Sequence, residues 1–179
     1  MLAYLLIALA LLVGAVLVAA MRKPNTFRVR RSAVIAAPAD RLHPLIDDLR
    51  QFNTWNPYAS KDPAMRITYR GPESGPGAAY DFQSGRAGTG SITVLDSAAG
   101  TVAMRQRMTA PFACDNTIEF ALAPRGDATE VTWTMSGANA FVGKVMSLFC
   151  NMDRMVGKDF ETGLAALKAQ AEQRNAVPA

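Results

Sequence analysis

The first hydrophobic segment of the chain is a single long run. Residues 1–21 contain no charged side chain, and only Gly14 interrupts the apolar and small residues of Leu2–Ala20. Because an α-helix rises about 1.5 Å per residue, about 20 residues reach the roughly 30 Å of a bilayer's hydrocarbon core. The pattern predicts an N-terminal transmembrane helix over residues 1–21. The alternative is a cleaved signal peptide ending near Ala20, although such peptides have a basic start and a shorter apolar run.

The pattern that follows predicts a strand and then a short helix. Residues Phe27–Ala36 have strand character. Apolar side chains then recur at helical spacing through residues 40–52, with Asp40 as the N-cap. Pro44 lies inside this stretch, so the helix must begin near His43 or kink there.

From residue 65 the chain becomes a series of short strands separated by glycine and proline turns. In several of them apolar and polar side chains alternate, as where Ile118, Phe120 and Leu122 oppose Thr117 and Glu119. Spacings of about 8–14 residues between turns are typical of an antiparallel meander with one wet face and one apolar face. The predicted strands are Met65–Tyr69, Ala78–Phe82, Gly90–Leu95, Thr101–Thr109, Asn116–Ala123 and Thr129–Ser136.

One long amphipathic helix is predicted to close the chain, from about Phe141 to Glu172. Its apolar side chains step by three or four residues, as the buried stripe of such a helix does. The apolar face of the sheet is the obvious place for this stripe. No internal repeat or second domain is visible. We therefore expect a basic linker over residues 22–25, one α+β domain over 26–173 and a tail over 174–179.

Positive charge is concentrated just after the apolar segment. The chain has a formal net charge of +4, and its first five bases precede any acid, which leaves 14 basic and 15 acidic side chains in the rest. This balance argues against nucleic-acid binding, which uses bases clustered on the domain itself. The positive-inside rule then predicts a single-pass protein of the inner membrane with its domain in the cytoplasm; the periplasmic side is the alternative. This evidence for the orientation weakens if Arg28, Arg30 and Arg31 lie on the solvent face of a first strand.

Residues for metal or covalent chemistry are scarce. One histidine, His43, excludes multi-histidine metal sites, and two cysteines, Cys114 and Cys150, exclude a disulfide framework. No phosphate loop, nucleophile elbow or metal-spaced cysteine pair occurs. The acids Asp153 and Glu161 are expected on a solvated face or as tethers to nearby loops. We expect no cofactor and no metal.

Four short motifs carry a resemblance to a known family. They are Ile35-Ala36-Ala37-Pro38, Leu45-Ile46-Asp47-Asp48, Trp55-Asn56-Pro57 and the block from Asn151 to Phe160. With the order of the predicted elements, they resemble the START-like superfamily, specifically the SRPBCC group of bacterial polyketide cyclases/dehydrases and lipid-transport proteins. The similarity covers about residues 26–170. It implies a helix-grip fold: a curved antiparallel sheet wrapped on a long C-terminal helix, with a cavity between them for a hydrophobic ligand.

The predicted lining of that cavity follows from alternation and helical spacing. The large, adaptable candidates are Met104, Met108, Phe120, Trp133, Met135, Met146, Phe149, Met152 and Met155. The inward polar candidates are Gln106, Asn116 and Tyr80, which would orient a carbonyl or hydroxyl group of a ligand. Trp55 would gate the mouth or wedge the short helices onto the sheet. The alternative for each apolar residue is core packing, and for each polar one a hydrogen bond to backbone.

Three functions remain open. We favour a membrane-tethered module that binds or transports a hydrophobic small molecule or lipid, with the membrane and that ligand as partners. The second is an enzyme, a cyclase or dehydratase acting on an aromatic or polyketide-like substrate. The third is a structural or chaperone-like protein whose filled core leaves no cavity.

Overall fold

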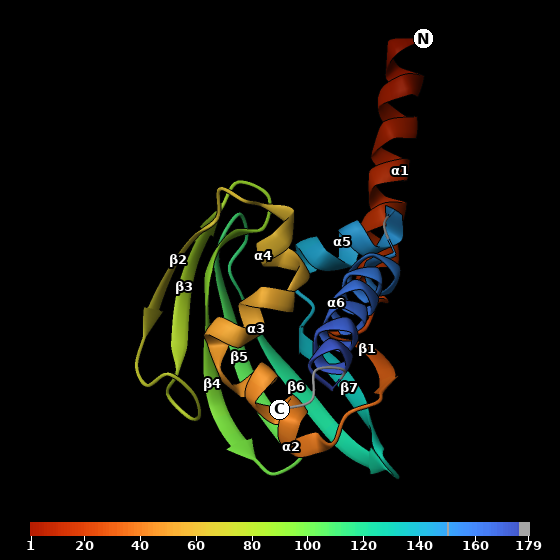
Figure 1. The fold of residues 1–179 in the computed structure, drawn as a ribbon. Coiled ribbons are helices and arrows are strands. Elements are labelled where there is room, and N and C mark those ends of the chain that lie inside the picture. The colour runs from red at the N-terminus through yellow and green to blue at the C-terminus, as the bar shows by residue number, and fades with distance from the viewer. Residues whose placement is uncertain (150, 176–179) are drawn as a thin grey trace.

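Seven strands form one curved antiparallel sheet in the computed structural model, which describes residues 1–149 and 151–175 (Figure 1). The strands are β1 (Thr26–Ile35), β2 (Arg66–Arg70), β3 (Ala79–Ser84), β4 (Gly88–Ala98), β5 (Thr101–Ala110), β6 (Cys114–Arg125) and β7 (Ala128–Ala138). The helices are α1 (Leu2–Met21), α2 (Ala39–Asp47), α3 (Leu49–Trp55), α4 (Pro57–Lys61), α5 (Phe141–Phe149) and α6 (Met152–Asn175). The predicted α+β class and helix-grip arrangement are confirmed.

The sheet is a meander of six consecutive strands, and the first strand of the chain is added at its β7 edge. The strand order is β1-β7-β6-β5-β4-β3-β2, so β1 lies at one edge and β2 at the other. All neighbours are antiparallel. Each of the seven predicted strands is present within a few residues of its expected ends. Tight turns at Gly100 and Gly126, both with positive φ, let β4 and β6 extend further than predicted.

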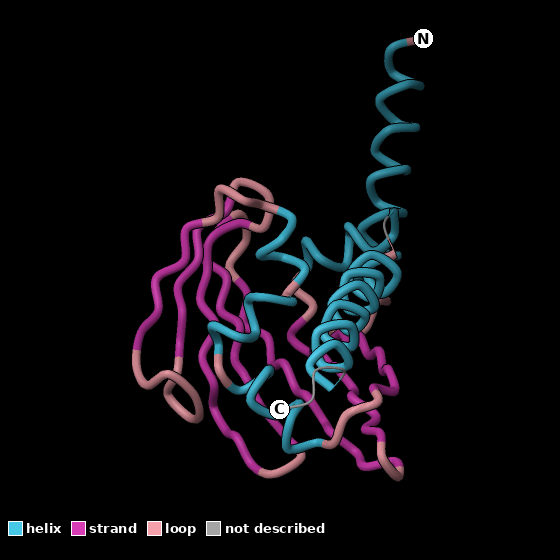
Figure 2. The backbone as a smooth tube through the Cα atoms, viewed as in Figure 1, coloured by secondary structure: helices cyan, strands magenta, loops and turns pink. Residues whose placement is uncertain are grey.

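Three short helices and α6 cover the concave face of the sheet (Figures 1 and 2). The helix predicted over residues 40–52 is in fact two helices. Asp48 is extended, and its carboxylate accepts hydrogen bonds from the backbone N–H groups of Arg50 and Gln51, which caps α3. Asn56 caps α4 in the same way, followed by Pro57 at the first helical position.

The predicted long C-terminal helix is present as α6, but it begins at Met152 and not near Phe141, because residues Phe141–Phe149 form the separate helix α5. The side chain of Asn151 accepts a hydrogen bond from the backbone N–H of Arg154 at 2.9 Å, which caps the start of α6. α6 crosses the sheet and contacts β1, α3 and α4, whereas α5 packs against α1. The apolar spacing continued through the break, so the sequence pattern did not reveal it.

An aromatic cluster fills the space between α6 and the middle of the sheet. The rings of Trp133 on β7 and Phe160 on α6 are stacked, with centroids 4.1 Å apart and an interplanar angle of 6°. Phe52 and Trp55 of α3 meet edge to face at 4.9 Å and pack on the same cluster. α6 approaches closely because Gly163 has no side chain: a Cβ there would lie 2.8 Å from the Trp133 ring.

Ion pairs fix α6 at both of its sides. The guanidinium of Arg31 on β1 binds Asp153 at 3.1 Å and Glu161 at 2.7 Å. Asp159 pairs with Lys61 of α4. These acids are therefore tethers, which is one of the two roles expected for Asp153 and Glu161. Arg31 is engaged in this clamp and Arg28 and Arg30 lie on β1, so the orientation cue rests on Arg22 and Lys23.

The N-terminal helix projects from the body of the protein (Figure 1). Leu2–Met21 is one continuous helix of 20 residues, long and apolar enough to cross a bilayer. A signal sequence near the N-terminus would meet the same criteria of length and composition.

Candidate functional site

The strand registers bring three predicted polar residues into one row across the concave face. Asn116 of β6 pairs with Gln106 of β5, Gln106 pairs with Ile92 of β4, and Ile92 pairs with Tyr80 of β3. Alternation within three separate strands predicted each of these polar side chains to point inward. Their alignment follows from the turns that set each register.

Gln106 and Asn116 form an amide pair in this row. Asn116 Nδ2 donates to Gln106 Oε1 at 3.1 Å and also contacts Cys114 Sγ at 3.6 Å. The Asn116 side chain is buried, and its Oδ1 has no hydrogen-bond partner among the described residues. A buried acceptor without a partner costs about 1–3 kcal/mol. A donor group on a ligand would recover part of that cost.

A glycine makes room for the amide of Asn116. Gly137 is its partner on β7, and a Cβ at Gly137 would overlap Asn116 Oδ1. Phe27 of β1 pairs with Gly137 on the other side and completes the row toward that edge. Sequence reasoning missed both residues, although Phe27 occupies an inward position in the alternation of its strand.

Burial along β5 separates the concave face into two halves. Val102 and Met104 are 1% and 0% exposed, whereas the next inward residues, Gln106 and Met108, are only half-buried. Cys114, opposite Met108 on β6, is half-buried as well. Because these side chains alternate onto the concave face, that face opens toward the β5–β6 turn. We call the region around Gln106, Met108, Cys114 and Asn116 the open half.

The other half of the concave face is filled. The aromatic cluster includes three predicted lining residues, Trp55, Phe120 and Trp133. Trp55 is 3% exposed and its Nε1 donates to the backbone carbonyl of Leu45 at 2.7 Å, so it wedges α3 onto α2 rather than gating the mouth. Trp133 Nε1 is buried and has no hydrogen-bond partner among the described residues.

The methionines expected to line the cavity from the C-terminal helix are not all directed inward. Met146 on α5 is 45% exposed and Met155 on α6 is 57% exposed, contrary to the expectation that they face the sheet. Met146 lies on α5, which packs on α1. Met135 on β7 is buried, in the row next to Asn116. The side chains of Phe149 and Met152 lie outside the described residues.

Tyr80 belongs to a second polar group beneath the short helices. Its hydroxyl accepts from Asn56 Nδ2 at 3.5 Å, and the same nitrogen donates to Asn53 Oδ1 at 3.1 Å. Asn53 in turn donates to the hydroxyl of Tyr69 at 3.2 Å. Burial raises the pKa of Tyr80, so its phenol is a weaker acid than an ordinary tyrosine and is protonated at neutral pH. Asn56 was in a motif quoted for the family resemblance, but its contact with Tyr80 depends on the fold.

The site offers polar groups for orientation and few for acid–base chemistry. Gln106, Asn116 and Tyr80 are neutral, and the described residues contain no cluster of three His, Cys, Asp or Glu side chains that would hold a metal ion. Among the described residues, a pairing of His43 with Cys114 is also excluded. His43 bonds Ser97 near the far end of β4, whereas Cys114 begins β6 at the open half.

The comparisons with known proteins agree with this architecture. A family profile described as polyketide cyclase/dehydrase and lipid transport matches residues 26–172. No curated protein gives a significant sequence match.

The structural neighbours share the fold at low sequence identity. Protein CV1439 from Chromobacterium violaceum has a TM-score of 0.59 and 16% identity, over 84% of this chain and 99% of that one. A Thermobifida fusca protein solved by NMR has a TM-score of 0.61 and 23% identity, over 82% and 93%. StfQ, a di-domain aromatase/cyclase of steffimycin biosynthesis, has a TM-score of 0.61 and 13% identity, over 85% and 52%. At these identities the likeness concerns the fold.

Proposed function

Because the chain belongs to the polyketide cyclase/dehydrase and lipid-transport family, we propose that it binds a hydrophobic small molecule or lipid in the open half of its concave face. We further propose that α1 holds this binding module at a membrane. The observation that carries the proposal is the buried, unpartnered Oδ1 of Asn116 beside half-buried inward side chains. The half-buried side chains offer a mostly apolar surface, and rotation of the Asn116 amide beneath it would present an acceptor to a ligand's donor.

The lining of the open half suits a ligand with a long apolar part. Met108 and Phe82 approach each other across Gly90, where a Cβ would lie 2.9 Å from the Phe82 ring and 3.1 Å from Met108 Sδ. Methionine adapts its shape to different apolar partners. A fatty acid or a sterol-sized molecule with one hydroxyl or protonated carboxyl group has the matching chemistry.

A ligand-binding measurement tests the proposal directly. The full-length chain is purified in detergent, delipidated and titrated with a fluorescent fatty acid. We expect saturable binding that Met108→Trp weakens at least tenfold, because the larger ring fills the open half. Arg107→Trp is the matched control, since Arg107 is the exposed neighbour on the opposite face of β5. Absence of binding in the wild type, or equal affinity in both variants, would contradict the proposed site.

A second candidate function is a cyclase or dehydratase acting on an aromatic or polyketide-like substrate. It is favoured by the family and by the protonated phenol of Tyr80, which lies in the same row as the amide pair. A neutral phenol in an apolar site can donate a hydrogen bond to an oxygen of a bound substrate and so stabilise negative charge that develops there. Tyr80→Phe should then abolish turnover of a linear polyketide analogue while leaving its binding unchanged. If Tyr80→Phe turns over substrate at the wild-type rate, this role for Tyr80 is wrong.

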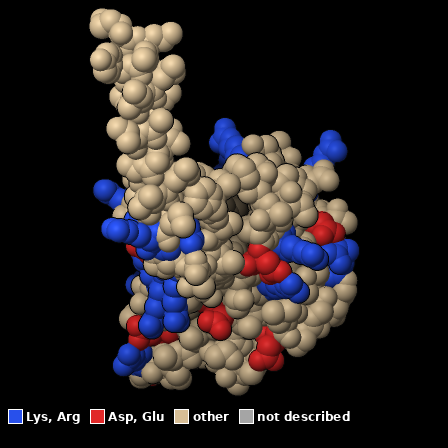
Figure 3. Space-filling view, turned by 180° about the vertical axis from the view of Figure 1, so that it is seen from behind, with Lys and Arg blue, Asp and Glu red and all other residues tan. Residues whose placement is uncertain are grey.

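The membrane side is proposed from the charges next to α1. Arg22 and Lys23 follow the apolar helix directly, and Figure 3 shows α1 free of charged side chains, with Lys and Arg gathered at its foot. By the positive-inside rule the domain lies in the cytoplasm of a bacterial cell. A green fluorescent protein fused to the C-terminus should fluoresce. A fused alkaline phosphatase that is active instead would place the domain in the periplasm, and a soluble, shortened chain would identify residues 1–20 as a signal peptide.

A further inference from the structure

The helix α5 lies beside the last turns of the apolar helix α1, and this position restricts where it can be in a membrane-bound protein. The two helices pack together, and the residues of α1 with reduced exposure are Gly14, Val16, Ala19 and Ala20. From Gly14 to Met21 the helix rises about 10 Å. With α1 across a bilayer, α5 therefore lies at the depth of the boundary between acyl chains and headgroups, where interfacial helices are buried by about 5–10 Å.

The side chains of α5 fit this depth. Phe141, Val142 and Met146 are 48%, 48% and 45% exposed, which is unusual for large apolar side chains on a nine-residue helix. Its one charged residue, Lys144, binds the side chain of Asn25 just beyond the end of α1. The charge is thus held toward the protein and the end of the span, while the apolar side chains remain uncovered by the described residues.

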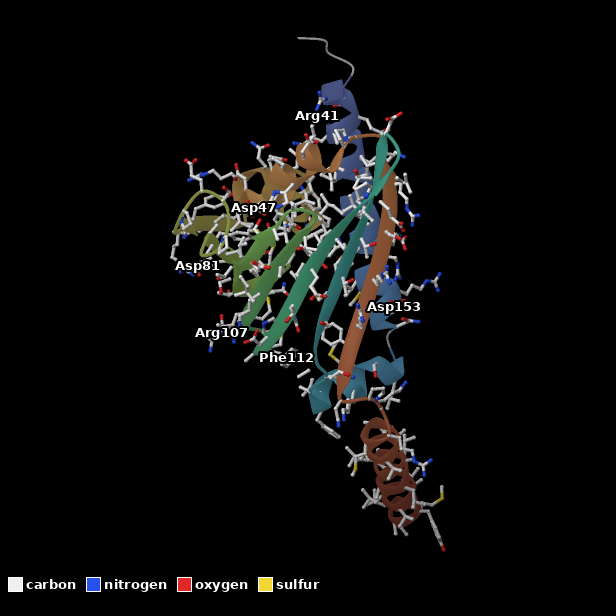
Figure 4. All side chains as sticks on the ribbon, turned by 90° about the horizontal axis from the view of Figure 1, so that it is seen from below. Arg41, Asp47, Asp81, Arg107, Phe112 and Asp153 are labelled. Atoms are coloured by element: carbon white, nitrogen blue, oxygen red, sulfur yellow. The ribbon has the colours of Figure 1, made fainter. Side chains whose placement is uncertain are left out.

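A turn of the sheet adds a further apolar side chain at the same end. Phe112 in the β5–β6 turn is 59% exposed. The β5–β6 turn, the start of β1 and the end of β7 lie at one end of the sheet, because Asn116 near the start of β6 pairs with Gly137, and Thr26 pairs with Ala138. Figure 4 shows Phe112 near α5 at the end from which α1 extends, with Arg41 at the opposite end.

We propose that Phe112 together with Phe141, Val142 and Met146 forms a rim that inserts into the headgroup layer of an anionic bilayer, so that the open half of the concave face opens onto the membrane. The proposal rests on the membrane attachment proposed above for α1. Charge complementarity supports a lipid occupant, because Arg22 and Lys23 directly follow α1 at the end where α5 packs on it, and bases near an anionic surface each contribute about 1 kcal/mol. A ligand would enter from the bilayer beside the β5–β6 turn.

Quenching by brominated lipids tests the contact with the full-length chain in phosphatidylcholine/phosphatidylglycerol nanodiscs. Phe112→Trp and Phe141→Trp place a reporter at the rim with little change of shape. Leu95→Trp is the control, because Leu95 is 51% exposed and lies toward the far end of β4. After subtraction of the buried native tryptophans, we expect bromolipids to reduce rim-indole emission at least twofold and leave the Leu95→Trp emission unchanged. The proposal would be overturned if the rim indoles were quenched no more than the Leu95→Trp control. That result is expected if the rim binds another protein and not the lipid.

A second measurement separates failure of the rim from failure of the attachment and binding proposals. Flotation with lipid after alkaline carbonate reports the anchoring by α1, and the fatty-acid titration reports binding. A chain that floats and binds but shows unquenched rim indoles would make the rim alone wrong. With the rim correct, Phe112→Asp combined with Phe141→Asp should slow fatty-acid uptake from vesicles at least tenfold. The same variant should keep its affinity for detergent-dispersed fatty acid, and unchanged uptake from vesicles would count against entry from the bilayer.

Discussion

The guanidinium group of Arg31 lies directly over Gly157 of α6, where a Cβ would overlap it. From this position Arg31 reaches Asp153 and Glu161, which lie one turn of the helix before and after the glycine. The clamp therefore requires both the arginine on β1 and the missing side chain on α6. The clamp holds α6 against β1, the edge strand that follows α1 in the chain.

Substitution of Gly157 by alanine should stabilise the protein only when the arginine is absent. Alanine is favoured over glycine inside a helix by about 1 kcal/mol, so Gly157→Ala in an Arg31→Ala background should stabilise the protein by about that amount. With Arg31 present, the methyl group displaces the guanidinium and this gain is lost. A double-mutant cycle of denaturant unfolding in detergent should give a coupling energy of about 1 kcal/mol or more. Additive effects of the two substitutions would show that the clamp does not depend on Gly157.

The stacked pair of Trp133 and Phe160 should be the most sensitive position in the filled half. Phe160 is fully buried, and removal of a buried phenylalanine side chain costs about 3–5 kcal/mol. We therefore expect Phe160→Ala to lower the unfolding free energy by that amount. Trp133→Phe should cost less, since the ring contacts are largely kept and the indole N–H has no partner among the described residues. Equal losses for the two variants, measured by denaturant titration, would contradict this account of the cluster.

Asn116→Leu should distinguish between a structural amide and one that orients a ligand. The substitution removes the unpartnered acceptor, so stability should change little or increase. A fatty acid or alcohol that donates to Asn116 should bind up to about tenfold more weakly, whereas an alkane of the same length should bind equally well. The affinities can be compared by displacement of the fluorescent probe. Equal weakening for the alkane and the alcohol would mean that the substitution changes the shape of the open half.

Asp62 should make the β3–β4 turn sensitive to acid. A hydrogen bond from the hydroxyl of Ser84, at 2.6 Å, is the main cause that lowers the pKa of Asp62, and backbone N–H groups add to it. Because the pKa is lower in the folded state, Asp62 stabilises the protein above its unfolded pKa of about 3.9, and this stabilisation disappears as the pH falls through the folded value.

The variant Asp62→Asn isolates this contribution. The wild type should have the higher melting temperature at pH 6, and the difference between the two proteins should shrink as the pH falls below about 4. Asp127→Asn, in the exposed β6–β7 turn, is the control for the removal of one carboxylate. A constant difference between wild type and Asp62→Asn from pH 6 to pH 2.5 would contradict the assignment.

Most of the fold could be predicted because its elements are marked locally. Alternation in residues such as Ile118, Phe120 and Leu122 identifies the buried face of a strand, and glycine and proline turns separate the strands. The break between α5 and α6 could not be predicted, since apolar residues keep helical spacing across it. The spacing identifies an apolar stripe but not its partner: the helix that carries Met146 packs against α1, and the Met146 side chain itself is 45% exposed.

The candidate site could be predicted only residue by residue. Alternation correctly placed Gln106 and Asn116 on the concave face. That they pair with each other depends on the length of the β5–β6 turn, which sets the register. The division into a filled and an open half depends on how closely α6 approaches, and the absence of a side chain at Gly163 is visible in the sequence only after the helix has been placed against Trp133.

The short segment between α1 and β1 limits how the domain can move relative to its anchor. Four residues, Arg22 to Asn25, join the helix to the sheet, and an extended chain of this length spans about 13 Å. The side chain of Asn139 also donates to the carbonyl of Pro24, at 3.2 Å, so this linker is hydrogen-bonded to the end of β7. A domain on such a short, bonded linker has little freedom to rotate relative to α1. With α1 in a bilayer, the same end of the sheet would always face the lipid. A hydrophobic ligand would then pass from the bilayer to the protein with almost no exposure to water.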